Sequence, residues 1–285
     1  MAGSSGADEA ILGLHALPRA LRACGDKATD ECGACRGDVQ RAAAVASPMI
    51  DRMVTLVLLP GMDGSGELFE PLLLALHGRI DSVVVRYPDD DTAGYDDLAK
   101  RAAAVLPHDA PFILLGESFS GPIAVTLAAA RPTGLVGLIL CCTFVRNPRP
   151  AFGGLRALVG RLPAIAPPLA CMHRLLMGRF STPALRAAFR RSMAQVRPST
   201  LRTRLQAVLG VDAGAQLVAV DVPILDLRAS HDRVVPASAG AHVHRIRPDA
   251  RAVLLEGPHF LLQANPAAAA EAVLRFADES IRARQ

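Results

Sequence analysis

FILLGESFSG, residues 112–121, is the stretch that decides the fold predicted from this sequence. An apolar run of strand length leads into a Gly/Ser-rich turn, and an alanine-rich segment follows as far as residue 130. A serine between small residues at a strand-to-helix turn is typical of a nucleophile elbow, whose strained backbone leaves the serine oxygen exposed. The N-terminus of the following helix favours developing negative charge. We therefore predict that Ser118 is a nucleophile; the alternative is an ordinary Gly/Ser turn.

A nucleophilic serine needs a base, and the base needs an acid that orients it. With this type of turn, the acid and then the base follow the serine along the chain. Asp232 and His259 each come just after an apolar run of strand length, where catalytic groups gather in open parallel sheets. We predict that Ser118, Asp232 and His259 form a catalytic triad. Asp226 lies inside a predicted strand and is expected to be buried instead.

Two backbone N–H groups are expected to bind the oxyanion of such a reaction. One belongs to Phe119, the residue after the nucleophile. We assign the other to Met62 in the glycine-rich loop LPGMDGSG, residues 59–66, and we place Gly61 against the substrate. The alternative is a phosphate-binding loop, but the Gly-Lys-Ser/Thr ending of a nucleotide P-loop is missing.

From residue 54 onward, short apolar runs alternate with segments of helix length. This alternation predicts an α/β fold, with a mostly parallel sheet and helices on both faces. The expected strands are 54–59, 82–86, 112–115, 135–141, 224–228 and 252–255, and the clearest expected helices are 68–77, 95–106 and 121–130. A long interval of proline-punctuated, helix-like pieces separates the fourth strand from the fifth. It predicts a helical lid at about residues 147–216.

The composition bounds the class of protein. The chain has 285 residues, 51% of them hydrophobic, which is enough for a sizeable core. Six cysteines are too few for a disulfide scaffold, and a net charge of +4 does not by itself indicate a nucleic-acid-binding protein. The sequence has no run of 18 apolar residues that predicts a transmembrane segment. Without the features of a secretory signal at its N-terminus, a cytoplasmic location is expected.

Residues 1–48 show no clear periodicity. We expect 1–48 to be a poorly ordered N-terminal extension and 49–285 to form the folded domain. Cys32 and Cys35, with Cys24 nearby, could supply half of a zinc site. A structural zinc needs four ligands, and no second Cys/His pair has the spacing of a zinc finger. No metal is therefore expected.

Four motifs together resemble those of the α/β-hydrolase superfamily, at residues 58–64, 116–121, 230–236 and 257–260. The chain looks most like small capped carboxylesterases, including the type that demethylates pimeloyl-carrier-protein methyl ester. It departs from the usual pattern at Ser120, where the elbow commonly has glycine, and at Pro60, where the common His-Gly pair is Pro-Gly. The family usually begins with two antiparallel strands, which residues 1–48 do not suggest. A reduced sheet of about six strands is therefore expected.

The predicted lid is strongly basic. Residues 118–211 contain 13 arginines and not one Asp or Glu. Such a field could steer an acyl group carried on an acidic carrier protein or on coenzyme A, or it could rest on anionic lipid. The third interpretation is solvated surface, paired with the acidic remainder of the chain. We assign Arg179 and Leu175 to substrate contacts, although apolar lid residues could equally form the packing face of lid helices.

These features predict a serine hydrolase that cleaves an ester or thioester through an acyl-enzyme intermediate. The reaction needs no metal or organic cofactor, and the possible partner is an acidic acyl carrier. One alternative is an acyltransferase, in which an alcohol or thiol captures the same intermediate. The other is a non-catalytic α/β-hydrolase-fold protein that binds a small ligand or a protein. An intact triad argues against that second alternative.

Overall fold

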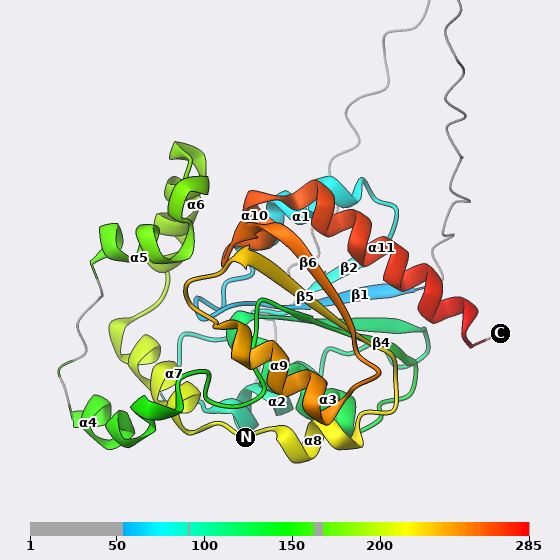
Figure 1. Ribbon diagram of the computed structural model, residues 1–285, viewed down its shortest axis with the longest axis horizontal. Coiled ribbons are helices and arrows are strands. Elements are labelled where there is room, and N and C mark those ends of the chain that lie inside the picture. Colours follow the sequence, from blue (N-terminus) through cyan, green and yellow to red (C-terminus); the bar gives the residue numbers. More distant parts are fainter. Residues whose placement is uncertain (1–53, 91, 162, 164–167, 285) are drawn as a thin grey trace, which may run out of the picture. The chain divides into compact units, whose positions relative to one another are not determined.

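The computed structural model describes residues 54–90, 92–161, 163 and 168–284 (Figure 1). Within this part, six strands form one sheet in the order β2-β1-β3-β4-β5-β6, and every neighbouring pair is parallel. The strands are β1 (Thr55–Leu59), β2 (Asp81–Val84), β3 (Phe112–Glu117), β4 (Leu135–Cys141), β5 (Ile224–His231) and β6 (Arg251–Pro258). The predicted parallel α/β fold with about six strands is therefore confirmed. The prediction for residues 1–48 lies outside the described residues.

Helices connect the strands. Before β4 these are η1 (Glu67–Phe69), α1 (Glu70–Leu76), α2 (Tyr95–Ala103), η2 (Ser118–Ser120) and α3 (Gly121–Ala129). Between β4 and β5 lie η3 (Pro150–Leu155), α4 (Arg156–Arg161), α5 (Leu169–Leu176), η4 (Gly178–Phe180), α6 (Pro183–Met193), α7 (Pro198–Gly210) and α8 (Gly214–Ala219). After β5 come α9 (Ala237–Ile246), α10 (Leu261–Ala264) and α11 (Pro266–Arg282).

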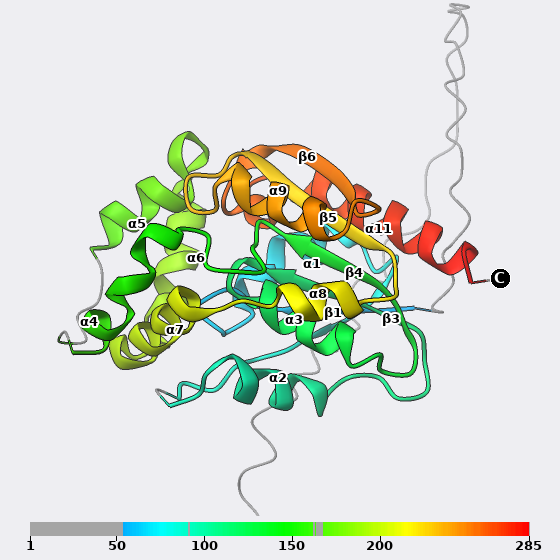
Figure 2. The same cartoon turned by 60° about the horizontal axis from the view of Figure 1, so that its bottom comes forward.

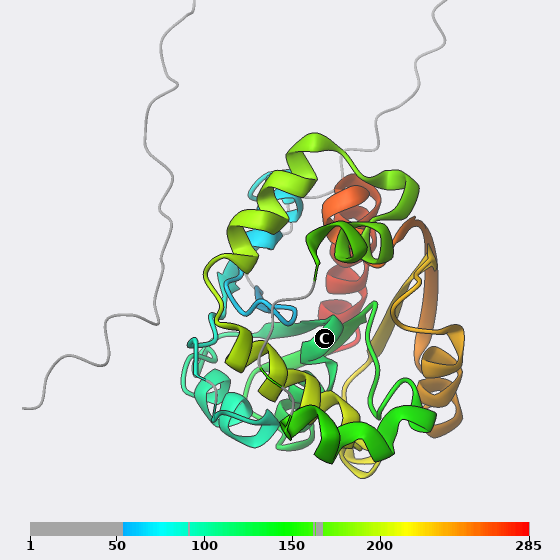
Figure 3. The same ribbon diagram turned by 90° about the vertical axis from the view of Figure 1, so that its left-hand side faces the viewer.

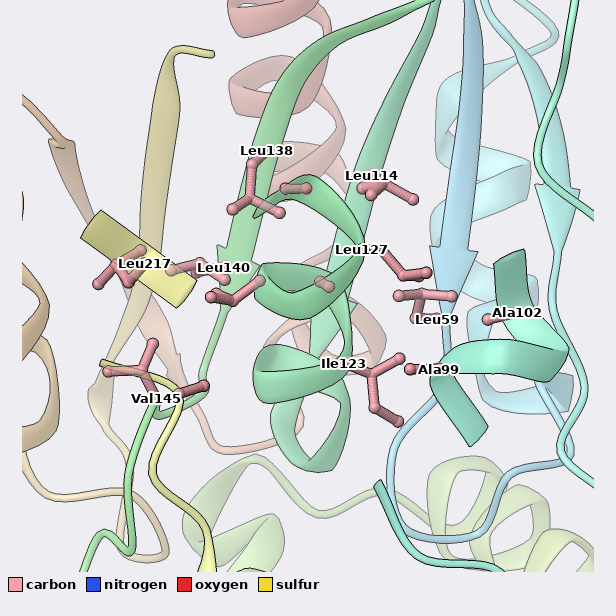
Figure 4. Packing of buried hydrophobic residues seen from close by; sticks show 14 of the residues in the cluster. Leu59, Ala99, Ala102, Leu114, Ile123, Leu127, Leu138, Leu140, Val145 and Leu217 are labelled. Carbon is pink, nitrogen blue, oxygen red and sulfur yellow. The ribbon is translucent and has the colours of Figure 1, made fainter. Parts of the chain in front are cut away.

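The strands are apolar on both faces, because each face is covered by helices. Along β3, Phe112 and Leu114 pack into one hydrophobic cluster, while Ile113 and Leu115 pack into the other. Helices α2, α3, α8 and α9 contribute to the first cluster, part of which Figure 4 shows. Helices α1, α10 and α11 contribute to the second. Coverage on both faces explains why the inner strands β1, β3 and β4 are almost entirely apolar and buried, whereas the edge strands β2 and β6 carry exposed polar residues.

The described residues of the lid, defined as residues 147–216, are mostly helical. Helices α4, α5, α6 and α7 lie at one end of the sheet in two views of the molecule (Figures 1 and 2). Figure 3 looks at this end directly. The lid therefore lies at the end of the molecule opposite the C-terminus of α11.

Three strands extend beyond their predicted ends. The predictions for β3, β5 and β6 ended at Leu115, Arg228 and Leu255. The strands reach Glu117, His231 and Pro258. Backbone pairing continues there, as His231 still pairs with Pro258. The residues just before Ser118, Asp232 and His259 are therefore held in place by the backbone pairing of the sheet. Among the described helices, none is both long and apolar enough to cross a membrane.

Candidate active site

Ser118 lies directly after β3, at the start of η2. Its φ angle is 50°, a left-handed backbone conformation that is uncommon for residues other than glycine. The Thr143 hydroxyl donates a hydrogen bond to the Ser118 carbonyl and helps to hold this turn. A Cβ added at Gly121 would lie 2.1 Å from Thr143 Oγ1, so only glycine fits where the turn meets β4. The predicted strained elbow is therefore present, and Gly121 supplies the required space.

The three predicted triad residues form a continuous hydrogen-bonded chain. Ser118 Oγ lies 2.8 Å from His259 Nε2, and His259 Nδ1 lies 2.8 Å from Asp232 Oδ2. His259 is 3% exposed. All three residues stand at the carboxyl ends of strands, Ser118 after β3, Asp232 after β5 and His259 after β6. The parallel sheet thus brings together residues that are up to 141 positions apart.

The Asp232 carboxylate is fixed on both oxygens. Oδ1 accepts hydrogen bonds from the backbone N–H groups of Val234 and Val235, each at 2.8 Å, while Oδ2 faces His259. The two backbone donors hold the carboxylate in one orientation. Asp226, the other aspartate of this region, is buried within β5 as expected, and it contacts His244 at 3.1 Å.

The two predicted oxyanion donors lie on well-anchored segments. Phe119 is buried, and its ring stacks on Tyr95 with the ring centroids 4.7 Å apart. The carbonyl of Met62 accepts a hydrogen bond from Arg204 Nη1 at 2.7 Å. This contact fixes the peptide plane that follows Met62. The assignment of the Met62 and Phe119 N–H groups to the oxyanion remains a prediction.

The three residues assigned to substrate contacts lie in different parts of the structure and differ in their contacts. Gly61 lies in the loop beside the nucleophile, and a Cβ added there would lie 4.0 Å from Glu117 Oε2. Leu175 on α5 is 40% exposed. Arg179 forms an ion pair with Glu256 at 2.9 Å, and both side chains are exposed. Arg179 is therefore already engaged by the body of the protein, which weakens its assignment to an anionic substrate.

Glu117 is a buried carboxyl group next to the nucleophile that the sequence reasoning missed. Its Oε1 accepts a hydrogen bond from Gln263 Nε2 at 2.8 Å. Burial raises the pKa of Glu117 to about 7, with a smaller contribution from the nearby Asp63. The sequence contained one signal for this buried group: a charged residue stands between Gly116 and Ser118, at the end of an apolar strand.

We expect Glu117→Gln to change how stability depends on pH. Because the pKa of Glu117 is raised on folding from 4.5 to about 7, wild-type stability falls as pH rises through this window. The loss is roughly 3 kcal/mol. Glutamine stays neutral, and its oxygen can still accept from Gln263. Urea unfolding of both proteins at several pH values should show a stability difference that grows from acid to neutral pH; a constant difference would contradict this expectation.

The sequence of the chain matches a family of known proteins. Residues 77–263, more than half of the chain, match the family described as serine aminopeptidase, S33. The chain belongs to this family of α/β-hydrolases. The predicted membership of the α/β-hydrolase superfamily is thus confirmed, and the chain is a hydrolase.

Solved structures share the fold. A thermophilic esterase from Thermogutta terrifontis has a TM-score of 0.68 at 19% identity, covering 80% of this chain and 89% of its own. MenH from S. aureus has a TM-score of 0.66 at 16% identity, covering 81% and 96%. The enol-lactonase from Burkholderia xenovorans LB400 has a TM-score of 0.64 at 18% identity, covering 80% and 92%. Similarity at these identities shows the fold alone.

One relative is closer in sequence. Polyketide synthase ThaQ from Burkholderia thailandensis is 29% identical over 258 residues. The match covers 81% of this chain and only 12% of the synthase. The chain therefore corresponds to a small part of that much longer protein.

Proposed function

We propose that this chain is a serine hydrolase that cleaves an ester or thioester through an acyl-enzyme intermediate. The observation that carries the proposal is the chain of two 2.8 Å contacts that joins Ser118 Oγ to His259 and His259 to Asp232. This geometry is within the reach that a nucleophile, a base and an orienting acid require.

The reaction proceeds in two halves. Ser118 Oγ attacks the acyl carbonyl carbon while its proton moves to His259 Nε2, and the resulting oxyanion is bound by the N–H groups of Met62 and Phe119. The bond to the leaving group then breaks, and the leaving oxygen or sulfur takes the proton from His259. In the second half, water attacks the acyl-enzyme carbonyl and gives a proton to His259. His259 then returns this proton to Ser118 Oγ as the bond between Ser118 and the acyl group breaks, which releases the acid and restores free Ser118. Asp232 holds the imidazole and stabilises its charged form.

A fluorophosphonate probe tests the nucleophile directly. We expect a single covalent adduct in the intact mass of the wild-type protein and none in Ser118→Ala. The absence of an adduct on folded wild-type protein would contradict the proposal and favour a binding protein.

For the substrate, we propose an acyl group on an anionic carrier. The match to a segment of a polyketide synthase favours an acyl substrate. The lid also presents exposed arginines, namely Arg156, Arg161, Arg174, Arg190 and Arg191. Other arginines serve the fold instead, since Arg197 pairs with Asp89 at 2.7 Å and Arg204 is buried. The five exposed arginines are therefore the ones available to attract an acidic carrier.

Salt should separate carrier-linked from free substrates. Electrostatic steering raises association rates and falls steeply with ionic strength. We expect kcat/KM on a thioester carried by an acidic protein to fall roughly tenfold between low and high salt. A short neutral ester, hydrolysed at the same Ser118, is the control and should change much less. Equal salt dependence for both substrates would rule against the carrier while leaving the hydrolase intact.

A further inference from the structure

Arg204 is a buried arginine whose role is not evident from its position in the sequence. It lies in the middle of α7, in the lid, yet it is 1% exposed. Its Nη1 donates to the carbonyl of Met62 at 2.7 Å, and its Nη2 donates to the carbonyl of Pro88 at 2.9 Å. The guanidinium carbon lies 5.9 Å from the centre of the Tyr87 ring. A lid arginine thus reaches into the core and holds the loop that carries a predicted oxyanion donor.

The loop is shaped to receive this guanidinium. Gly64 has a φ angle of 73°, and a Cβ at this position would lie 2.7 Å from Arg204 Nη1. The Gly64 carbonyl accepts from the backbone N–H of Tyr87 at 2.8 Å. Burying a charged group is costly unless hydrogen bonds compensate, so such a group is expected to have a specific role. One of its two hydrogen bonds is directed at the backbone of the oxyanion loop, defined as residues 60–66, and the other at the backbone carbonyl of Pro88.

A second lid residue, Ser192, holds the same loop at Asp63, the residue after Met62. Ser192 on α6 donates to Asp63 Oδ2 at 2.7 Å, and the backbone N–H of Ser65 donates to the same oxygen at 3.0 Å. Both Asp63 and Ser192 are buried. The oxyanion loop is therefore fixed by two helices of the lid, through Met62 and through Asp63.

The nucleophile elbow joins this network from the other side. Ser120 Oγ donates to the carbonyl of Pro60 and lies 2.7 Å from the Tyr87 hydroxyl. Ser120 and Pro60 are the two positions at which the sequence departs from the usual hydrolase pattern. The two departures are in contact with each other, so the serine that replaces glycine connects the elbow directly to the oxyanion loop.

We propose that Arg204 is a positioning residue, which sets the geometry of the oxyanion loop from the lid and acts with Ser120 from the elbow. This inference rests on the proposed hydrolase function. Preorganised donors stabilise a transition state only when they are held where the charge develops. Removing Arg204 should therefore weaken transition-state binding more than substrate binding, which a merely structural role would not do.

The decisive variant is Arg204→Met, with Arg275→Met on the exposed side of α11 as the matched control. On a short neutral ester, we expect Arg204→Met to lower kcat roughly 10- to 100-fold, with KM changing less than about threefold. Hydrogen exchange in residues 60–66 should become faster in this variant and stay unchanged in α11. The control should match wild type in both measurements. An unchanged kcat, or a rise in KM alone, would overturn the proposal.

Ser120→Gly is a second variant for the case in which Arg204→Met does not fold. It restores the residue that the elbow commonly carries and removes the contact with Pro60, so we expect a folded protein. Its kcat should fall about three- to tenfold with little change in KM, and exchange in residues 60–66 should rise. Wild-type kcat and exchange would count against the network. If the wild type hydrolyses no ester, the proposed function fails, while the exchange of the loop still decides whether Arg204 and Ser120 position it.

Discussion

Replacing Ser118 by alanine is expected to abolish nearly all turnover. The methyl group cannot form the acyl-enzyme, so His259 and Asp232 are left without a nucleophile to activate. Dissected triads lose about 10⁴–10⁶ in kcat when the serine is removed, and the oxyanion hole alone sustains the remainder. The loss should fall on kcat rather than on KM, because the serine hydroxyl contributes little to ground-state binding. Steady-state kinetics on a chromogenic ester measures it.

Ser230→Ala is the matched control for this variant. Ser230 is exposed and contacts His231 at 2.8 Å, two residues before the triad aspartate. Its removal should leave kcat within about twofold, as expected for a surface substitution. Near-normal turnover in Ser118→Ala would show that the hydrolysis proceeds without the elbow serine. The mechanism would then have to be abandoned even though the hydrogen-bonded chain is present.

The fold, and the contact between Ser118, His259 and Asp232, could be predicted because their signals are local. The inner strands β1, β3 and β4 are almost continuous apolar runs, since both faces of the sheet are covered there. Ser118, Asp232 and His259 each follow a predicted strand within a few residues and the observed strand directly, so the order of strands was enough to bring them to one edge. The elbow added a strained turn between small residues, which is also readable from adjacent positions.

The parts that could not be predicted depend on contacts between distant positions. Arg204 and Met62 are 142 residues apart, and Ser120 and Pro60 are 60 residues apart. In the sequence, Arg204 was one of 13 arginines without an acidic neighbour, and nothing separated it from those on the surface. Ser120 was noticed only as a departure from a pattern. The strand ends were missed for the opposite reason, because polar residues continue the backbone pairing after the apolar run has ended.

The lid arginines show how burial separates roles that composition groups together. Arg179 and Arg197 pair with Glu256 and Asp89 of the body, as the interpretation of a paired surface predicted. Arg204 instead binds backbone carbonyls in the interior. A single field of positive charge thus contains residues that hold the fold and residues that can meet a partner. Only the latter are expected to contribute to the salt dependence proposed for carrier-linked substrates.

Asp232→Asn is expected to lower kcat by about 10⁴ without disturbing the fold. The physical reason lies in the two backbone donors on this side chain. Because Val234 and Val235 donate to Oδ1, the asparagine oxygen should remain there and its NH₂ group should turn toward His259 Nδ1. Nδ1 must then accept a hydrogen bond, so the imidazole carries its proton on Nε2. An imidazole in that tautomer cannot take the proton of Ser118.

The control for this substitution is an aspartate within β5, the strand that Asp232 follows, and it also contacts a histidine. Asp226 is buried in β5 and lies 3.1 Å from His244 Nε2, outside the triad. Asp226→Asn should reduce stability, because it alters a buried charged contact, while kcat per folded molecule stays within about threefold. Both variants should be compared by kcat on the same ester and by the rate of fluorophosphonate labelling. If Asp232→Asn keeps more than about a tenth of wild-type kcat, the carboxylate does not set the tautomer of His259. The two backbone donors would then serve only to fold the loop after β5.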